Sequence, residues 1–298
     1  MKILLLGAMG QVGWELQRSL APLGEVVALD RDTAETADFS RPDTLPALVA
    51  RHAPDVIVNA AAHTAVDKAE SEPELAHTLN ATAPGMLAQA AAGRGALLVH
   101  YSTDYVFDGS GEQARSEDAP TGPLSVYGRT KLAGEQAIRA SGGRHLILRT
   151  SWVYGTRGQN FPKTMLRLAQ EREVLRIVDD QVGAPTGADL LADVTAHTVR
   201  ATLGDARLGG TYHVAPQGEV SWHGFARYCI DTARELRPDL RWQLQRLDAI
   251  PSTDYPTPAR RPLNSRLNTA RLQAAFGLAL PRWEPGVRRM LAEFLTPS

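Results

Sequence analysis

Short apolar runs alternate with helical patterns through the first half of the chain, and this alternation restricts the fold more than any other feature. The runs KILLLG, EVVALD, DVIVNAAA, ALLVHYST and HLILRTSWVYG each have the length and composition of a buried strand. Between them lie segments with apolar residues at helical spacing, such as Val12, Leu16 and Leu20. Strands that alternate with helices are joined by right-handed crossovers. The sequence therefore predicts an α/β fold with a doubly wound parallel sheet.

The rhythm changes after residue 155. Helices are predicted over NFPKTMLRLAQE, over ADLLADVTAHTVRATL and, capped by Ser221, over SWHGFARYCIDTARELR, with short strands between them. Residues 249–265 are rich in proline and are predicted to lack regular structure, and two short helices follow. We expect a sheet domain over residues 1–155 and a smaller C-terminal cap over residues 156–298, interleaved with it. A cleft should lie between them, at the carboxyl ends of the strands.

Composition excludes several classes of partner. The 298 residues are 43% hydrophobic and carry a formal net charge of −1, so a general affinity for nucleic acid or anionic lipid is not expected. No run approaches the roughly 20 apolar residues that span a bilayer. The apolar run at the N-terminus is too short for a secretory signal, and we expect a cytoplasmic protein without a membrane partner. The single cysteine, Cys229, allows no intrachain disulfide and is expected to be buried.

A glycine-rich turn follows the first predicted strand. GAMGQVG places Gly7, Gly10 and Gly13 at intervals of three, where a helix begins. Glycine permits a tight turn and lets a pyrophosphate approach the backbone N–H groups of a helix N-terminus. Asp30 ends the second predicted strand, 17 residues beyond Gly13, and can accept a ribose 2′-hydroxyl, whereas Arg31 can face a 2′-phosphate. These opposed neighbours predict a Rossmann-type site that accepts both NADH and NADPH.

Tyr127 and Lys131 stand four residues apart in a predicted helix, so their side chains share one face. They could be a packed aromatic and a solvated lysine, or a catalytic acid and the cation that tunes it. Ser102 and Thr103, at the end of the fourth predicted strand, offer hydroxyls that could assist such an acid. The residues by themselves leave both interpretations open.

The glycine spacing, the Tyr-x-x-x-Lys pair, the Ser-Thr step and the segment NAAA resemble the extended short-chain dehydrogenase/reductase superfamily. Within it, PDVIVNAAAHTAVDKAESEPELAHTLNA, VHYSTDYVFDG, VYGRTKLAGE, RTSWVYG and DDQVGAPTGADLLAD resemble the dTDP-4-dehydrorhamnose reductase family, from residue 1 to about residue 290. Two departures stand out. Asp189 occupies a position where relatives often have Glu, and the loop over residues 112–120 fits no pattern of the family.

The resemblance implies a reductase that converts dTDP-4-dehydro-β-L-rhamnose to dTDP-L-rhamnose with NADPH or NADH, the last step of dTDP-L-rhamnose synthesis for surface polysaccharides. It gives Tyr127 the role of general acid and Thr103 a hydrogen bond to the carbonyl oxygen. Lys131 would lower the tyrosine pKa, about 10 in free tyrosine, and hold the nicotinamide ribose. The implied cofactor contacts are Gly7, Gly10, Gln11, Val12, Gly13, Asp30, Arg31, Asp38, Phe39, Ala62, His63, Thr64, Tyr101, Tyr127 and Lys131.

The resemblance also implies substrate contacts and a metal. Beside Thr103, it places Asp104 and Trp152 at the sugar. Independently of the resemblance, Arg260, Arg261 and Asn264 in the proline-rich loop are candidate contacts for a nucleotide diphosphate, because arginine binds phosphate bidentately. Members of the family can form homodimers around Mg²⁺ held by surface carboxylates, and the matching positions are Glu15, Asp189 and Glu293. For each of these residues the plain alternative is a solvated or core side chain.

Three other functions remain open at this stage. An epimerase or dehydratase of nucleotide sugars would use the same scaffold, although a dehydratase needs a second acid after Asp104, where this chain has Tyr105. A reductase of another 4-keto-6-deoxy nucleotide sugar would need the same residues. A non-catalytic, NADP-binding regulatory subunit would have no need of Thr103, Tyr127 and Lys131 together.

Overall fold

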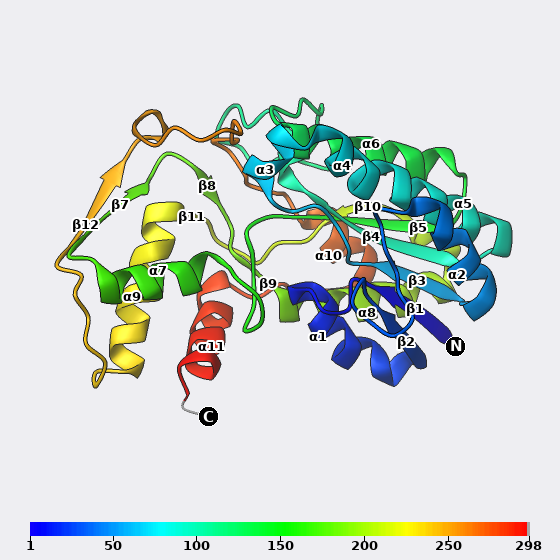
Figure 1. Ribbon diagram of the computed structural model, residues 1–298, viewed down its shortest axis with the longest axis horizontal. Coiled ribbons are helices and arrows are strands. Elements are labelled where there is room, and N and C mark those ends of the chain that lie inside the picture. The colour runs from blue at the N-terminus through cyan, green and yellow to red at the C-terminus, as the bar shows by residue number, and fades with distance from the viewer. Residues whose placement is uncertain (297–298) are drawn as a thin grey trace.

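Six parallel strands form one sheet in the larger part of the molecule (Figure 1). The structure is a computed structural model that describes residues 1–296. In spatial order the strands are β10 (Gly210–His213), β5 (His145–Thr150), β4 (Leu97–Thr103), β3 (Val56–Asn59), β1 (Lys2–Leu6) and β2 (Glu25–Leu29). Every neighbouring pair is parallel. The predicted α/β class with a doubly wound, Rossmann-type sheet is confirmed.

Helices cover both faces of this sheet, because successive side chains of a buried strand point to opposite sides. On β1, Ile3 and Leu5 pack with one cluster of buried residues, whereas Leu4 and Leu6 pack with another. One face carries α1 (Gln11–Leu20), α8 (Ala188–Gly204) and α10 (Ala270–Phe276). The other carries α2 (Leu45–His52), α5 (Ala83–Arg94) and α6 (Val126–Ala140). The sheet is thus buried on both faces.

A smaller unit stands beside the sheet (Figure 1, left). It contains the helices α7 (Phe161–Glu171), α9 (Trp222–Leu236) and α11 (Trp283–Leu295), and the parallel strands β7 (Val174–Val178) and β12 (Arg246–Ile250). Phe225, Trp283 and Val287 belong to its core. The predicted cap on α9 is present, because the Ser221 hydroxyl accepts a hydrogen bond from the Gly224 N–H at 3.0 Å.

The chain passes between the two units several times after residue 155. α8 packs on α1, and β10 pairs with β5. Short pairings join the segments between the units: β6 (Val153–Tyr154) with β9 (Thr186–Gly187), and β8 (Val182–Gly183) with β11 (Val220–Ser221). The last two residues of the predicted cap range, 297 and 298, lie outside the described residues.

Three local expectations differ from the structure. The fifth predicted strand is broken after Thr150, because Trp152 has a φ of 51°, which lies outside the strand region. The segment EPELAHTLNATAPGMLAQAAAGRG has the pattern of one long helix that Pro84 divides or kinks. The structure instead forms α4 (Pro73–His77), a π-helical turn (Thr78–Thr82) and α5 there, and α3 (Val66–Ser71) precedes them. The proline-rich segment is irregular except for the end of β12 and one 3₁₀ turn, Ser252–Asp254. Within residues 1–296, none of the helices is both long and apolar enough to cross a membrane.

Candidate active site

A cavity of about 1080 Å³ opens at the carboxyl ends of the sheet strands. It is bordered by the glycine turn, by the ends of β2, β3 and β4, by the first turns of α6 and by residues of the smaller unit. Most of the residues predicted for the site line it: Gly7, Gly10, Gln11, Val12, Asp30, Arg31, Asp38, Phe39, Ala62, Thr64, Tyr101, Thr103, Asp104, Tyr127, Lys131, Trp152 and Arg261.

The glycine turn packs so closely that side chains would not fit. Gly7 has a φ of +81°, and a Cβ there would lie 2.6 Å from the Ala61 nitrogen. A Cβ on Gly13 would lie 1.9 Å from the Gly7 carbonyl oxygen, so Gly13 lies behind the turn and lets α1 start against it. Gly10 caps α1 without a side-chain hydrogen bond, which leaves the first N–H groups of the helix to a ligand. This cradle fits the pyrophosphate of a dinucleotide.

Asp30 and Arg31 lie at the end of β2, at the edge of the cavity. The Asp30 carboxylate accepts hydrogen bonds from the Met9 N–H at 2.9 Å and from the Arg31 N–H at 2.7 Å. The Arg31 side chain is 73% exposed and lies 3.5 Å from Asp32. Asp30 is therefore fixed against the glycine turn, while Arg31 is free to move toward a phosphate.

Thr103 and Ser102 end β4 with their hydroxyls committed to different partners. The Ser102 hydroxyl donates to Glu135 at 2.6 Å, and Glu135 is held in turn by Arg149 at 2.7 and 2.8 Å. The Thr103 hydroxyl donates to Asp104 at 3.0 Å. Ser102 thus belongs to a buried charge network, and Thr103 is the hydroxyl available to a ligand.

The first turn of α6 presents Tyr127. Ser125 caps this helix by accepting a hydrogen bond from the Gly128 N–H at 3.2 Å. A Cβ on Gly128 would lie 2.3 Å from the Tyr105 carbonyl oxygen, so glycine lets the helix approach the end of β4. The Tyr127 and Tyr105 rings meet edge to face, with 5.5 Å between their centroids. These contacts fix the phenol beside Thr103.

The predicted effect of Lys131 on Tyr127 is wrong in this structure. Burial raises the pKa of Tyr127 to about 12, and only a hydrogen bond with Thr103 opposes the shift. Burial lowers the pKa of Lys131 to about 8. The Lys131 ammonium donates to the Tyr101 carbonyl at 2.6 Å and lies 3.2 Å from His100, so its hydrogen bonds go to β4. Tyr127 accordingly keeps its proton at neutral pH.

The far wall of the cavity is aromatic and charged. Trp152 stacks on Trp222, with 3.7 Å between ring centroids and 16° between ring planes. Arg261 forms a two-pronged ion pair with Asp67 of α3, at 2.7 and 3.0 Å. Asp104 is 2% exposed, and burial raises its pKa to about 6. Sequence reasoning missed Trp222, since its place at the start of a helix does not reveal that the helix points at the cavity.

Comparison with known proteins agrees with this geometry. The family model described as "RmlD substrate binding domain" matches residues 1–296. The chain belongs to this family. The dTDP-4-dehydrorhamnose reductase of Salmonella typhimurium is 56% identical over 299 residues, which cover 100% of this chain and 99% of the relative. The resemblance predicted from the sequence is confirmed.

Solved structures of the same family superpose on the whole chain. A dTDP-4-dehydrorhamnose reductase from Clostridium acetobutylicum has a TM-score of 0.89 at 35% identity, covering 99% of this chain and 100% of that one. The Bacillus anthracis enzyme, solved in complex with NADP, has a TM-score of 0.86 at 32% identity, covering 98% and 99%. The fold of the family therefore extends over both units.

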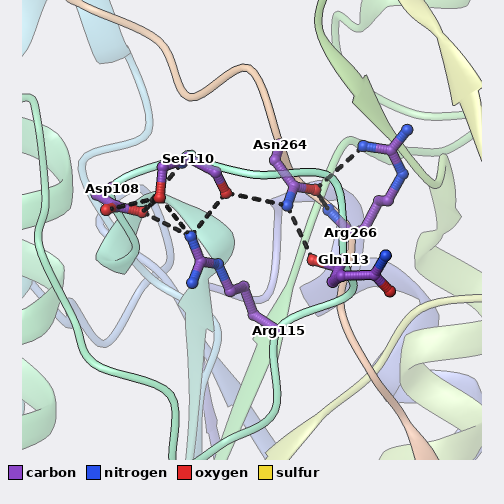
Figure 2. A network of polar contacts seen from close by, with 6 residues as sticks. All are labelled: Asp108, Ser110, Gln113, Arg115, Asn264 and Arg266. Carbon is purple, nitrogen blue, oxygen red and sulfur yellow. Dashed lines mark hydrogen bonds and ion pairs between the residues drawn. The ribbon is translucent and has the colours of Figure 1, made fainter.

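In this member of the family, three predicted site residues besides Gly13 lie outside the cavity wall. The Asn264 side chain is 2% exposed and donates to the Gln113 carbonyl at 2.9 Å and to the Ser110 carbonyl at 3.4 Å (Figure 2). It thereby fastens the 108–115 loop to the proline-rich segment. His63 is buried, and its backbone N–H donates to the Asn80 side-chain oxygen at 2.8 Å. Arg260 is not among the residues that border the cavity.

The three predicted metal ligands lie together, but a metal site is not supported. Glu15, Asp189 and Glu293 line a second pocket of about 240 Å³, together with Arg18 and Arg289. Arg18 lies 3.5 Å from Glu15, and Arg289 lies 3.8 Å from Asp189. Over the described part of the chain, no group of three or more His, Cys, Asp or Glu side chains could hold a metal ion. Arginines already pair with two of these three carboxylates, so the described residues of one chain do not fit Mg²⁺.

Proposed function

We propose that the protein reduces the C4 keto group of dTDP-4-dehydro-β-L-rhamnose to give dTDP-L-rhamnose, with NADPH or NADH as reductant. The observation that carries the proposal is the placing of Thr103, Tyr127 and Lys131 in one cavity with the glycine turn and Asp30. The name of the Salmonella typhimurium relative and the NADP in the Bacillus anthracis structure support the substrate and the cofactor.

The chemistry follows from the groups around the cavity. A bound reduced nicotinamide supplies a hydride to the carbonyl carbon. Tyr127 holds a proton on its phenolic oxygen, since burial raises its pKa to about 12, and donates that proton to the oxygen of the reduced carbonyl. Thr103 can turn its hydroxyl from Asp104 to the same oxygen and so orient it.

The remaining side chains would bind the two ligands. Asp30 would accept a ribose hydroxyl, and Lys131 would donate to the nicotinamide ribose. We assign the sugar to Asp104 and to the stacked pair of Trp152 and Trp222, and the nucleotide diphosphate to Arg261. The substrate-binding part then comprises α7, α9, α11, β7 and β12 together with the proline-rich segment, rather than all residues after 155.

We also propose that two copies of the chain associate as a homodimer. The pocket of Glu15, Asp189 and Glu293 lies on the surface of α1, α8 and α11, where a second copy could add ligands or counter-charges. Mg²⁺ would need such a second copy, because residues 1–296 of a single chain do not supply its site. The cytoplasmic location stays a prediction.

The decisive experiment supplies the ketosugar from freshly coupled upstream enzymes and follows the loss of reduced nicotinamide. We expect oxidation of both NADPH and NADH that depends on the ketosugar, with dTDP-L-rhamnose as the product. A regulatory subunit would bind NADP and turn over nothing. A reductase of another 4-keto-6-deoxy sugar would act faster on that sugar than on this one. Either result would overturn the assignment.

A further inference from the structure

Three polar side chains form a buried row beneath the cavity. Asn59 ends β3, His100 lies beside it on β4 in the same register, and Lys131 reaches them from α6. They are 1%, 1% and 2% exposed. The Asn59 Nδ2 lies 3.0 Å from the His100 Nδ1, and the His100 Nε2 lies 3.2 Å from the Lys131 Nζ. Because these side chains are almost fully buried, each member depends mainly on its neighbours for hydrogen bonds.

The orientation of the Asn59 amide is fixed by the backbone. Its Oδ1 accepts a hydrogen bond from the Ala61 N–H at 3.0 Å. A backbone N–H can only donate, so the amide oxygen must face Ala61 and the amide NH₂ must face His100. The Nδ1 of His100 therefore has to be an acceptor.

This orientation determines the tautomer of His100. A neutral imidazole carries one proton, and with Nδ1 as acceptor that proton lies on Nε2, pointing at Lys131. A lysine ammonium has three donors and no acceptor, so its N–H would meet the N–H of His100. A neutral amine has a lone pair that accepts from Nε2 while it still donates to the Tyr101 carbonyl at 2.6 Å.

We propose that His100, with its tautomer set by Asn59, disfavours the ammonium form of Lys131 and makes this lysine release its proton more readily than an ordinary lysine. His100 is then a positioning residue, and its effect on turnover rests on the proposed reduction being the protein's function. It acts on the charge of Lys131, one helical turn from the proton donor Tyr127.

The other charged and titratable groups around Lys131 leave this effect in place. Glu135, one turn further along α6, favours the ammonium, but it is held by Arg149 of β5 at 2.7 Å. The Tyr101 hydroxyl is bonded to Thr195 of α8. Burial acts in the same direction as His100, since it lowers the pKa of Lys131 to about 8 and that of His100 well below its ordinary value.

The test measures the His100 tautomer and the Lys131 titration, and neither measurement depends on turnover. NMR of protein labelled with ¹⁵N-histidine should show the His100 proton on Nε2, with the signal assigned by its loss in His100→Gln. Protein labelled in its lysine side chains gives the titration of Lys131. In His100→Gln an amide oxygen can accept from the ammonium, so we expect the Lys131 pKa to rise by about one unit or more.

A second variant reverses the tautomer. In Asn59→Asp a carboxylate can accept from both Ala61 and Nδ1–H, which turns Nε2 into an acceptor for the ammonium. The Lys131 titration should again move to higher pH, and the alkaline limb of kcat should move with it. His213→Gln is the matched control: His213 is a fully buried histidine on β10, outside the cavity, and its replacement should move neither.

Three results would overturn the inference. They are a proton on Nδ1 of His100 in the wild type, an unchanged Lys131 titration in folded variants, or an equal shift in His213→Gln. If Asn59→Asp does not fold, the wild-type tautomer and His100→Gln decide. Absence of turnover in the wild type, with the proton on Nε2, would instead remove the proposed function and leave the inference standing.

Discussion

Tyr127 shows how burial and a neighbouring cation compete at one residue. The sequence suggested that Lys131 would lower the tyrosine pKa, but the lysine bonds to Tyr101 and His100, and burial raises the pKa of Tyr127 to about 12. A phenol that stays protonated over the whole neutral range suits a donor in a reduction. A phenolate base for the reverse oxidation would need help from a bound cofactor or substrate.

Tyr127→Phe removes this proton donor without a change of shape. We expect kcat to fall by about 10²-fold or more, the usual scale of general acid catalysis, while the melting temperature stays near the wild-type value. Stopped or coupled assays with the ketosugar measure the loss. Tyr212→Phe is the control, because the Tyr212 hydroxyl bonds to the Leu208 carbonyl far from the cavity. Near-wild-type turnover of Tyr127→Phe would contradict its role.

Asp30 and Arg31 predict how the protein chooses its reductant. Asp30→Ala removes the carboxylate that disfavours a 2′-phosphate, so the ratio of kcat/KM for NADPH to that for NADH should rise. Arg31→Ala should lower the same ratio. Steady-state kinetics with each cofactor measure both changes. The interpretation fails if the wild type has no detectable rate with one of the two cofactors, or if neither variant changes the ratio.

Some residue roles could be predicted from the sequence and others could not. Ser102 and Thr103 must face opposite sides of a strand. Only the structure shows that the Ser102 hydroxyl bonds to Glu135, which Arg149 holds in turn. Asn264 was assigned to the substrate, yet its amide is used to fasten the 108–115 loop. Both outcomes depend on segments more than 30 positions away, which no local pattern encodes.

At the scale of elements, α6 depends on its contact with the π-helical turn Thr78–Thr82. A Cβ on Gly134 would lie 2.1 Å from the Asn80 carbonyl oxygen, so only glycine allows this approach. The Asn80 side chain also donates to Thr130 of α6 at 3.1 Å. The helix that carries Tyr127 and Lys131 is therefore set in place by a contact between two backbones.

Gly134→Ala should separate these elements. We expect a loss of about 1–3 kcal/mol in the free energy of unfolding, as for other overpacked sites, together with lower turnover. Gly93→Ala is the matched control, since Gly93 lies on α5 with nothing within 4 Å of an added Cβ, and it should gain up to about 1 kcal/mol. Denaturant unfolding of both variants measures the difference. Equal stabilities would show that the contact can relax.

Helical and strand periodicity predicted most elements, but it could not predict their interruptions. The π-helical turn keeps the apolar pattern of a helix, so the sequence around Pro84 reads as one helix with a kink. The break after Thr150 depends on the positive φ of Trp152, an uncommon conformation for a bulky residue. That conformation is maintained by tertiary contacts such as the stack on Trp222.

For the whole molecule, the pocket of Glu15, Asp189 and Glu293 predicts how two copies associate. If a second copy completes a Mg²⁺ site there, sedimentation should show a dimer that EDTA converts to monomer. If the arginines of the partner pair with these acids instead, the dimer should resist EDTA and weaken in high salt. Glu15→Ala should weaken the dimer, whereas Asp43→Ala, which changes an exposed acid outside the pocket, should leave it unchanged. A monomer under every condition would remove the proposal.

The position of β10 has a consequence for folding during synthesis on the ribosome. The strand at one edge of the sheet is made from Gly210–His213, and α8, which covers α1, ends at Gly204. Until those residues emerge, the nascent chain exposes the unpaired side of β5 and the apolar face of α1. An open strand edge invites pairing with other chains. More than two thirds of the protein must therefore be synthesised before β10 pairs with β5 and α8 covers α1. A chain that stops near residue 155 would be a substrate for chaperones and proteases.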